Sequence, residues 1–151
     1  MCSADLAEGG RIHWLGRITD AEKIARIKGA TVCCAPSLRG ESFGVVLIEA
    51  MAAGTAIVAS NLDGYRNVAT AGVDALTVEP GDVDALASAL RTALADERLR
   101  ARLVAAGERR ADDFSMLTLA ELYAERYLKI VAGGSEERPS RVRQWLSRML
   151  S

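Results

Sequence analysis

The chain has 151 residues, 50% of them hydrophobic and 26% charged, a balance typical of one globular domain rather than of a disordered chain. Its formal net charge of −1 and its 5% aromatic content give no support for nucleic-acid binding, which relies on basic surfaces and aromatic stacking platforms. The 3 cysteines and 1 histidine form no zinc-binding pattern, no apolar run approaches the ~20 residues that span a bilayer, and residues 1–10 lack a signal-peptide core, so we expect a cytoplasmic protein with reduced thiols.

The first part of the chain alternates between predicted strands and helices. The apolar run 12–16 favours a strand, and Asp20 is the expected cap of a short helix over 21–30. The next strand is expected over 31–35, and its continuous apolar character predicts burial on both faces, as in a parallel sheet.

The next helix is expected to begin near Ser42 and to end at Gly54, because glycine commonly terminates helices. The arginine-rich run 98–110 contains interleaved acids and is interpreted as a solvated helix face. The remaining elements are expected as strands over 55–60 and 75–78, a short helix within 65–69, and helices over 83–95, 97–111 and 116–132, the first and last of these three capped by Asp82 and Ser115. This alternation predicts an α/β fold, a parallel sheet with flanking helices, followed by C-terminal helices.

The C-terminal residues differ from the domain before them. We assign 1–133 to the domain, the polar run 134–140 to a linker and 141–150 to an amphipathic helix. An apolar stripe at i, i+3, i+4 and i+7 of that helix is formed by Val142, Trp145, Leu146 and Met149. Such a helix docks on the domain or on a partner domain, or it lies on an anionic membrane surface; a disordered tail is the third interpretation.

The segment RGESFGVVLIEAMAAG, residues 39–54, joins a predicted strand end to a predicted helix start. In open parallel sheets, ligands bind beyond the carboxyl ends of the strands. The first helical turn offers the backbone amides of Phe43, Gly44 and Val45 at the positive end of the helix dipole, which favours a phosphate. Gly44 has no Cβ, so a ligand can approach its backbone closely. A phosphate site is therefore predicted at this junction.

Two glutamates flank the junction. Glu41 lies just before the predicted helix and Glu49 about two turns inside it, ~12 Å apart along the axis if both were helical. The carboxylates of ordinary glycosidases are ~5–9.5 Å apart, so a hydrolytic acid–base pair is a poor interpretation. Two contacts along one elongated ligand, with a phosphate between them, fit the spacing better. The alternative for Glu49, whose neighbours are nearly all apolar, is a place on the narrow solvated edge of the helix.

The segment RGESFGVVLIEAMAAGTAIVAS, residues 39–60, resembles the signature of family 4 retaining glycosyltransferases: a Glu, seven residues, a second Glu, then Ala-Met-Ala-x-Gly and a strand. The flanking stretches RIHWLGRI, CAPS and LTVEPGDVDALASAL agree with it. The similarity covers about residues 10–131 and is greatest to actinobacterial phosphatidylinositol mannosyltransferases, which use GDP-mannose. It implies the C-terminal, donor-binding half of a GT-B enzyme, with a partial Rossmann-like domain that binds a nucleotide sugar.

The resemblance also implies roles for individual residues. Glu41 matches the first glutamate of the signature, which contacts hydroxyls of the donor sugar near the reacting carbon, and Glu49 matches the second, which binds the ribose hydroxyls. Family members transfer the sugar with retention and usually need no bound metal, so neither metal nor cofactor is expected. The segment whose backbone amides hold the sugar and the diphosphate matches Ser42, Phe43, Gly44 and Val45, and the segment around the base matches Ile18, Thr19, Asp20 and Lys23. Thr19 stands where the mannosyltransferases have an acidic residue.

Two parts of the family enzyme have no match in this sequence. These enzymes have two Rossmann-like domains with the active site between them. This sequence contains no match to the acceptor-binding domain, and none to the Gly-Arg…Lys-Gly loop that neutralises the diphosphate. One hydrogen-bond donor of this loop, placed against the charge that develops on the departing phosphate, is often worth ~3–4 kcal/mol in the transition state. We therefore expect an incomplete enzyme that acts with a missing N-terminal domain or a partner chain, in the cytoplasm or peripherally at the inner face of the membrane, on a phosphatidylinositol-type lipid. The alternatives are a non-catalytic nucleotide or nucleotide-sugar binding module and an inert truncated product.

Overall fold

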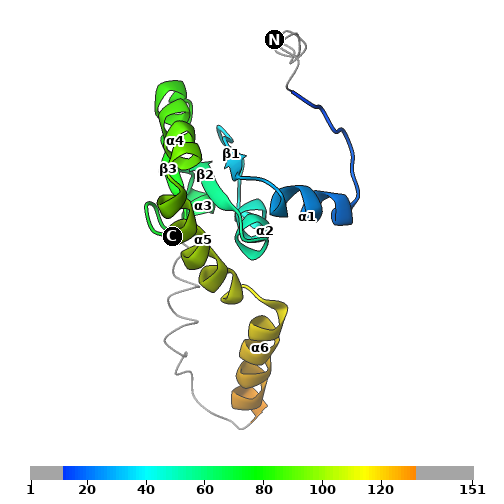
Figure 1. Ribbon diagram of the computed structural model, residues 1–151. Helices are drawn as coiled ribbons and strands as arrows, with labels where there is room; N and C mark the ends of the chain where they lie inside the picture. The colour runs from blue at the N-terminus through cyan, green and yellow to red at the C-terminus, as the bar shows by residue number, and fades with distance from the viewer. Residues whose placement is uncertain (1–11, 132–151) are drawn as a thin grey trace.

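A computed structural model describes residues 12–131, which form a small parallel sheet with helices around it (Figure 1). The strands are β1 (Val32–Ala35), β2 (Ala56–Ser60) and β3 (Leu76–Val78). The helices are α1 (Asp20–Lys28), α2 (Val45–Ala52), α3 (Asp63–Arg66), α4 (Val83–Ala95), α5 (Glu97–Asp112) and α6 (Met116–Val131). The predicted linker 134–140 and amphipathic helix 141–150 lie outside the described residues, as does Cys2.

The sheet is three-stranded in the order β1-β2-β3, and both pairings are parallel, which confirms the predicted α/β class (Figure 1). In the register of the sheet, Cys33 lies opposite Ile57 and Ala59 lies opposite Thr77. The central strand β2 is buried along its full length because a strand flanks it on each side and α2, α4 and α5 pack against it. The carboxyl ends of β1 and β2 therefore point to one edge of the sheet, where the loops leading to α2 and α3 begin.

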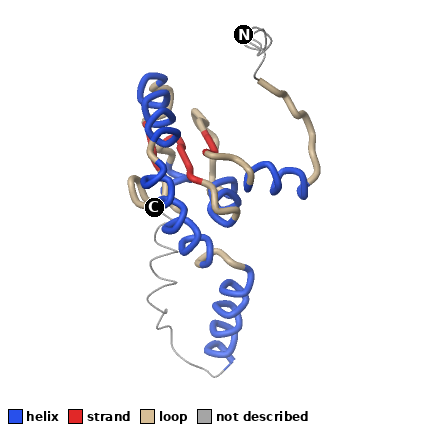
Figure 2. Tube along the Cα trace, in the orientation of Figure 1, coloured by secondary structure: helices blue, strands red, loops and turns tan. Residues whose placement is uncertain are grey.

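One strand prediction was wrong in part and a second was wrong altogether. The run 31–35 is not buried on both faces, because β1 is an edge strand in which Cys34 is exposed and only Ala35 is fully buried. The run 12–16 is not a strand: it extends away from the sheet in Figure 2, and the side chain of Trp14 is 64% exposed. A strand requires a neighbour for its backbone hydrogen bonds, and among the described residues β1 pairs with β2 alone.

The ends of the longer helices follow the sequence closely, with two exceptions, whereas the short helix α3 covers Asp63–Arg66 and not 65–69 as expected. Asp82 and Ser115 cap the helices that follow them, as predicted: their side-chain oxygens accept from the amides of Ala85 and Thr118. The cap of α1 is Thr19 and not Asp20, because the Thr19 hydroxyl accepts from the amide of Glu22, three residues on.

The second exception is α2, which begins at Val45 and not near Ser42, because Gly44 adopts a left-handed conformation with φ of 95°. Its end is as predicted. Gly54, with φ of 71°, follows the last turn, and the amides of Gly54 and Thr55 donate to the carbonyls of Met51 and Ala50. This pattern closes the helix and turns the chain into β2.

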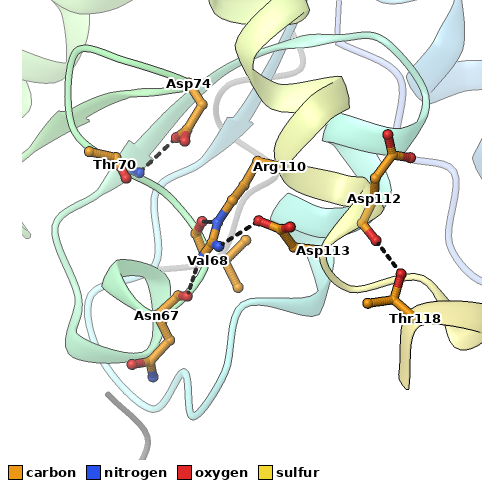
Figure 3. Close-up of polar contacts among 8 residues, drawn as sticks. All are labelled: Asn67, Val68, Thr70, Asp74, Arg110, Asp112, Asp113 and Thr118. Atoms are coloured by element: carbon orange, nitrogen blue, oxygen red, sulfur yellow. Dashed lines mark hydrogen bonds and ion pairs between the residues drawn. The ribbon is translucent and has the colours of Figure 1, made fainter. Parts of the chain in front are cut away.

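The predicted solvated arginine face of α5 was wrong for Arg110. Its guanidinium donates from Nε to the carbonyl of Val68 at 2.8 Å and from Nη2 to the carbonyl of Asn67 at 2.8 Å, and it pairs with Asp113 at 3.1 Å (Figure 3). It also lies 4.6 Å from the centre of the Phe114 ring. The planar fork of arginine makes this possible, because one side chain bridges the loop after α3 and the end of α5.

The same loop contains a second polar contact. Asp74 is 5% exposed and accepts from the amide of Thr70 at 2.7 Å (Figure 3). Burial raises the pKa of the Asp74 carboxyl, while the bond from Thr70 and the positive charge of Arg110 oppose that rise. Together the two contacts fix the chain between α3 and β3.

Helix α3 supports the loop that joins β1 to α2. A Cβ at Gly64 would overlap the carbonyl oxygen of Glu41 and lie 2.9 Å from the carbonyl carbon of Ser42, so only glycine allows this backbone contact. The neighbouring Tyr65 is 2% exposed, and its hydroxyl lies 3.2 Å from that of Ser37, near the start of the same loop. Helix α3 therefore contacts the loop near both of its ends, through Gly64 and Tyr65.

Helix α6 projects away from the sheet in Figure 1 and exposes Leu117, Leu128 and Ile130. Within residues 12–131, no helix combines the length and the apolar character that crossing a membrane requires.

Replacing Arg110 by lysine is expected to lower the free energy of unfolding by about 1–3 kcal/mol, because one ammonium cannot reach both carbonyls and Asp113. Urea denaturation of the Arg110→Lys and Arg109→Lys variants measures this, since Arg109 is the exposed neighbour on the same helix. Equal stability of the two variants would contradict the role assigned to Arg110.

Replacing Gly64 by alanine is expected to cost about 1–3 kcal/mol of stability, because the added methyl must displace the backbone of Glu41. Gly29→Ala is the matched control: a Cβ there meets its nearest atom, the carbonyl oxygen of Ala25, at 3.3 Å. Thermal unfolding compares the two variants, and a Gly64→Ala protein as stable as Gly29→Ala would refute the close contact.

Candidate functional site

The first predicted contact residue, Glu41, lies at the amino end of α2. Its Oε1 accepts a hydrogen bond from the amide of Gly44 at 3.0 Å, so the side chain folds back over the start of the helix. A carboxylate at this position is stabilised by the positive end of the helix dipole. Glu41 is half-buried, and its backbone contacts Gly64.

The burial of Gly44 contradicts the expected reason for a glycine at this position. Gly44 is buried, so a ligand does not approach its backbone from solvent. A Cβ there would lie 3.0 Å from Cδ1 of Tyr65, and the left-handed φ of 95° disfavours other residues. Glycine is required here by the fold, and its amide already donates to Glu41.

The later start of α2 also changes which amides the first turn presents. Those at the beginning of the helix belong to Val45 and Val46, and the amide of Leu47 donates to the carbonyl of Gly44 at 2.9 Å. Ser42 is exposed, whereas the ring of Phe43 turns inward and meets that of Phe114 edge to face at 5.9 Å. Phe43 thus anchors the loop in the core, and only its backbone is left for a ligand.

The second predicted contact residue, Glu49, lies about one turn inside α2, and not two, because the helix begins at Val45. It does not stand alone on a solvated edge. Its Oε1 accepts from the ammonium of Lys23 in α1 at 2.8 Å, and both side chains are about one-third exposed, 34% for Glu49 and 36% for Lys23. The hydrogen bond to Glu49 raises the pKa of Lys23, and the hydrogen bond to Asp20 adds to this rise.

The other residues predicted to surround a base lie at the start of α1. Thr19 caps that helix, and its side chain is engaged with the amide of Glu22. The carboxylate of Asp20 is 3.4 Å from the ammonium of Lys23 and is 93% exposed. Ile18 is half-buried just before the helix. Lys23 therefore connects this segment to Glu49, although 26 positions separate the two residues in the sequence.

The structure thus divides the predicted residues into two groups. One gathers at the amino end of α2 around Glu41, and the other joins α1 to α2 through the Lys23–Glu49 pair. A shallow hollow of about 470 Å³ lies elsewhere, between β3 and α4, and shares no residue with either group. Among the described residues, no group of three or more His, Cys, Asp or Glu side chains could hold a metal ion.

Three supporting residues were not recognised from the sequence: Gly64, Tyr65 and Arg110. The dipeptide Asp63-Gly64 after a buried strand is a turn signal that could have pointed to Gly64. Nothing in the local pattern distinguishes Arg110 from the arginines around it, because its partners are backbone carbonyls more than 40 positions away, 42 for Val68 and 43 for Asn67.

A family model and the sequences of known proteins match most of the chain. The model of the family "Glycosyl transferases group 1" matches residues 3–110. The phosphatidyl-myo-inositol mannosyltransferase of Mycobacterium leprae is 43% identical over 125 residues, 83% of this chain and 33% of that protein. The protein of the same name from Mycolicibacterium smegmatis is 41% identical over 132 residues, 87% of this chain and 34% of that protein.

Two solved structures superpose on most of the chain. The sucrose-phosphate synthase of Thermosynechococcus elongatus superposes with a TM-score of 0.73 at 31% identity, over 83% of this chain and 32% of that chain. HepE of Anabaena in complex with UDP-glucose superposes with a TM-score of 0.70 at 25% identity, over 80% of this chain and 33% of that chain.

The chain spans about a third of the length of the relatives that it matches. The matched third contains the sheet, the loop of Glu41 and the Lys23–Glu49 pair, and it has the parallel α/β architecture of the GT-B structures. The chain belongs to the group 1 glycosyl transferases.

Proposed function

We propose that this chain is the donor-binding part of a retaining glycosyltransferase and holds a nucleotide sugar across the amino end of α2. The observation that carries the proposal is the placement of two glutamates about the start of one short helix, Glu41 in the loop before α2 and Glu49 within α2. Glu41 lies at its amino end and Glu49 lies one turn along it, with the amides of the first turn between them. Glu49 lies four positions after Val45, or ~6 Å of helical rise, a span suited to a diphosphate and its ribose.

In this arrangement each group has one task. Glu49 accepts hydrogen bonds from the ribose hydroxyls, and the amides of Val45 and Val46 face the diphosphate at the positive end of the helix dipole. Glu41 accepts from hydroxyls of the sugar near the carbon that is transferred. The bond from the Gly44 amide holds one oxygen of Glu41 in place, which limits the entropy lost when the sugar binds.

The donor that we propose is GDP-mannose, and the acceptor is a phosphatidylinositol-type lipid. The support is the identity of 43% and 41% to proteins named phosphatidyl-myo-inositol mannosyltransferase. HepE, which is 25% identical, was solved with UDP-glucose, so a nucleotide sugar fits the wider group, and the base is the finer part of the proposal. We propose that transfer also requires an acceptor-binding domain of the kind found in two-domain enzymes of this family.

The alternative function is a binding module that holds a nucleotide or nucleotide sugar without transferring it. The site geometry supports it equally well up to the binding step, because the described residues contain both glutamates and the helix start. Mixing the chain with GDP-mannose and a phosphatidylinositol acceptor, with and without the N-terminal portion of a mannosyltransferase relative, separates the two functions. Mannosyl transfer only in the complemented mixture supports the enzyme; binding without transfer in both supports the module.

Isothermal titration of the chain with GDP, UDP and GDP-mannose tests the binding step. We expect weak binding that Glu49→Ala reduces about tenfold or more, because hydrogen bonds to a charged group are worth about 1.5–3 kcal/mol. Glu121→Ala, an exposed glutamate of α6, is the control and is expected to leave the affinity unchanged. Equal affinities of the wild type and Glu49→Ala would refute the ribose assignment, and no binding of any of the three ligands would refute the proposed function.

A further inference from the structure

The pair formed by Lys23 and Glu49 joins two helices that are not adjacent in the chain. Lys23 lies on α1 and Glu49 on α2, and β1 runs between these helices in the sequence. The distance from Nζ to Oε1 is 2.8 Å, which is a charge-assisted hydrogen bond as well as an ion pair. The resemblance places Lys23 near a base, but the structure directs its ammonium to the carboxylate proposed to receive the ribose.

This contact determines the orientation of the carboxylate. A ribose diol donates two hydrogen bonds, and a carboxylate accepts them well when both of its oxygens face the diol. The hydrogen bonds that residues 12–131 make to the Glu49 side chain reach Oε1 alone, so Oε2 and the remaining lone pair of Oε1 are left for a ligand. A carboxylate fixed in this way loses less rotamer freedom on binding than one that turns in solvent.

The contact also changes the local charge. Asp20 and Glu49 are both anionic and both lie within 4 Å of the Lys23 ammonium, at 3.4 Å and 2.8 Å. Without that ammonium, two carboxylates would repel the diphosphate of an approaching nucleotide. Lys23 therefore offsets part of a repulsion that Glu49 would otherwise add to its own binding site.

We propose that Lys23 is a positioning residue, which holds the Glu49 carboxylate in the orientation that accepts the ribose diol. The inference rests on the proposed function, since it concerns how that same site binds its nucleotide. It is not a stability device: both side chains are about one-third exposed, at 36% and 34%, and ion pairs in such positions add little to the stability of the fold.

The test compares Lys23→Met with Lys23→Arg, in titrations with GDP and UDP and with their 2′,3′-dideoxy forms. Arginine keeps a donor within reach of Glu49, and the dideoxy nucleotides lack the diol. Lys28→Met, an exposed lysine of the same helix, controls for the loss of one positive charge from α1. Circular dichroism confirms that every variant remains folded.

We expect Lys23→Met to weaken the binding of the tighter nucleotide by about tenfold, the order of one immobilised side chain, and to weaken the binding of its dideoxy form less, because only the lost positive charge still acts on the diphosphate. Lys23→Arg and Lys28→Met are expected to bind like the wild type. In the Glu49→Gln background, Lys23→Met is expected to have no further effect, because the group that it orients is then uncharged.

Two results would overturn the inference alone. One is a nucleotide affinity that falls in Glu49→Gln but not in Lys23→Met. The other is an equal loss for the normal and dideoxy nucleotides, which would make Lys23 a direct contact to the base or phosphate. Failure of the wild-type chain to bind either nucleotide would overturn the proposed function together with the inference.

Discussion

The backbone contact between Gly64 and Glu41 is the constraint on which the candidate site depends. This contact determines how closely the loop after β1 packs on α3, because no side chain separates the two backbones. The contact is itself held from α5: Arg110 binds the carbonyls of Asn67 and Val68, at the end of the segment that contains Gly64. Arg110, on a helix that also packs against α2, thus supports the loop of Glu41 through α3.

The loop is also fixed from the opposite side. Phe43 packs on Phe114, whose ring lies under the guanidinium of Arg110, so the residue that supports α3 supports the loop as well. The second part of the site is less rigidly held. Lys23 and Glu49 meet on the partly exposed faces of α1 and α2. Within residues 12–131, no other ion pair or hydrogen bond joins the Glu49 side chain to α1. We infer that Glu41 is positioned by the core and Glu49 by a single charged partner.

Much of this arrangement could be predicted from local sequence. The buried strand β2, the helix cap Asp82 and the glycine stop at Gly54 are encoded within a few residues, and these three were predicted. Most of the errors concern partners that are distant in the sequence, and the cap of α1, Thr19 in place of Asp20, is the local exception. Whether 12–16 forms a strand depends on a neighbouring strand, and the start of α2 depends on the packing of Gly44 against Tyr65. The family signature located both glutamates, but neither the signature nor the residue pattern indicated that Lys23 would bind one of them.

The most direct test of donor binding at α2 is to map backbone amide chemical shifts while GDP is added to the chain. The account predicts that the largest changes fall at Glu41, Val45, Val46 and Glu49, with smaller ones at Lys23. Changes centred instead on the hollow between β3 and α4, at residues such as Thr77 and Ser88, would contradict it, because that hollow shares no residue with the proposed site.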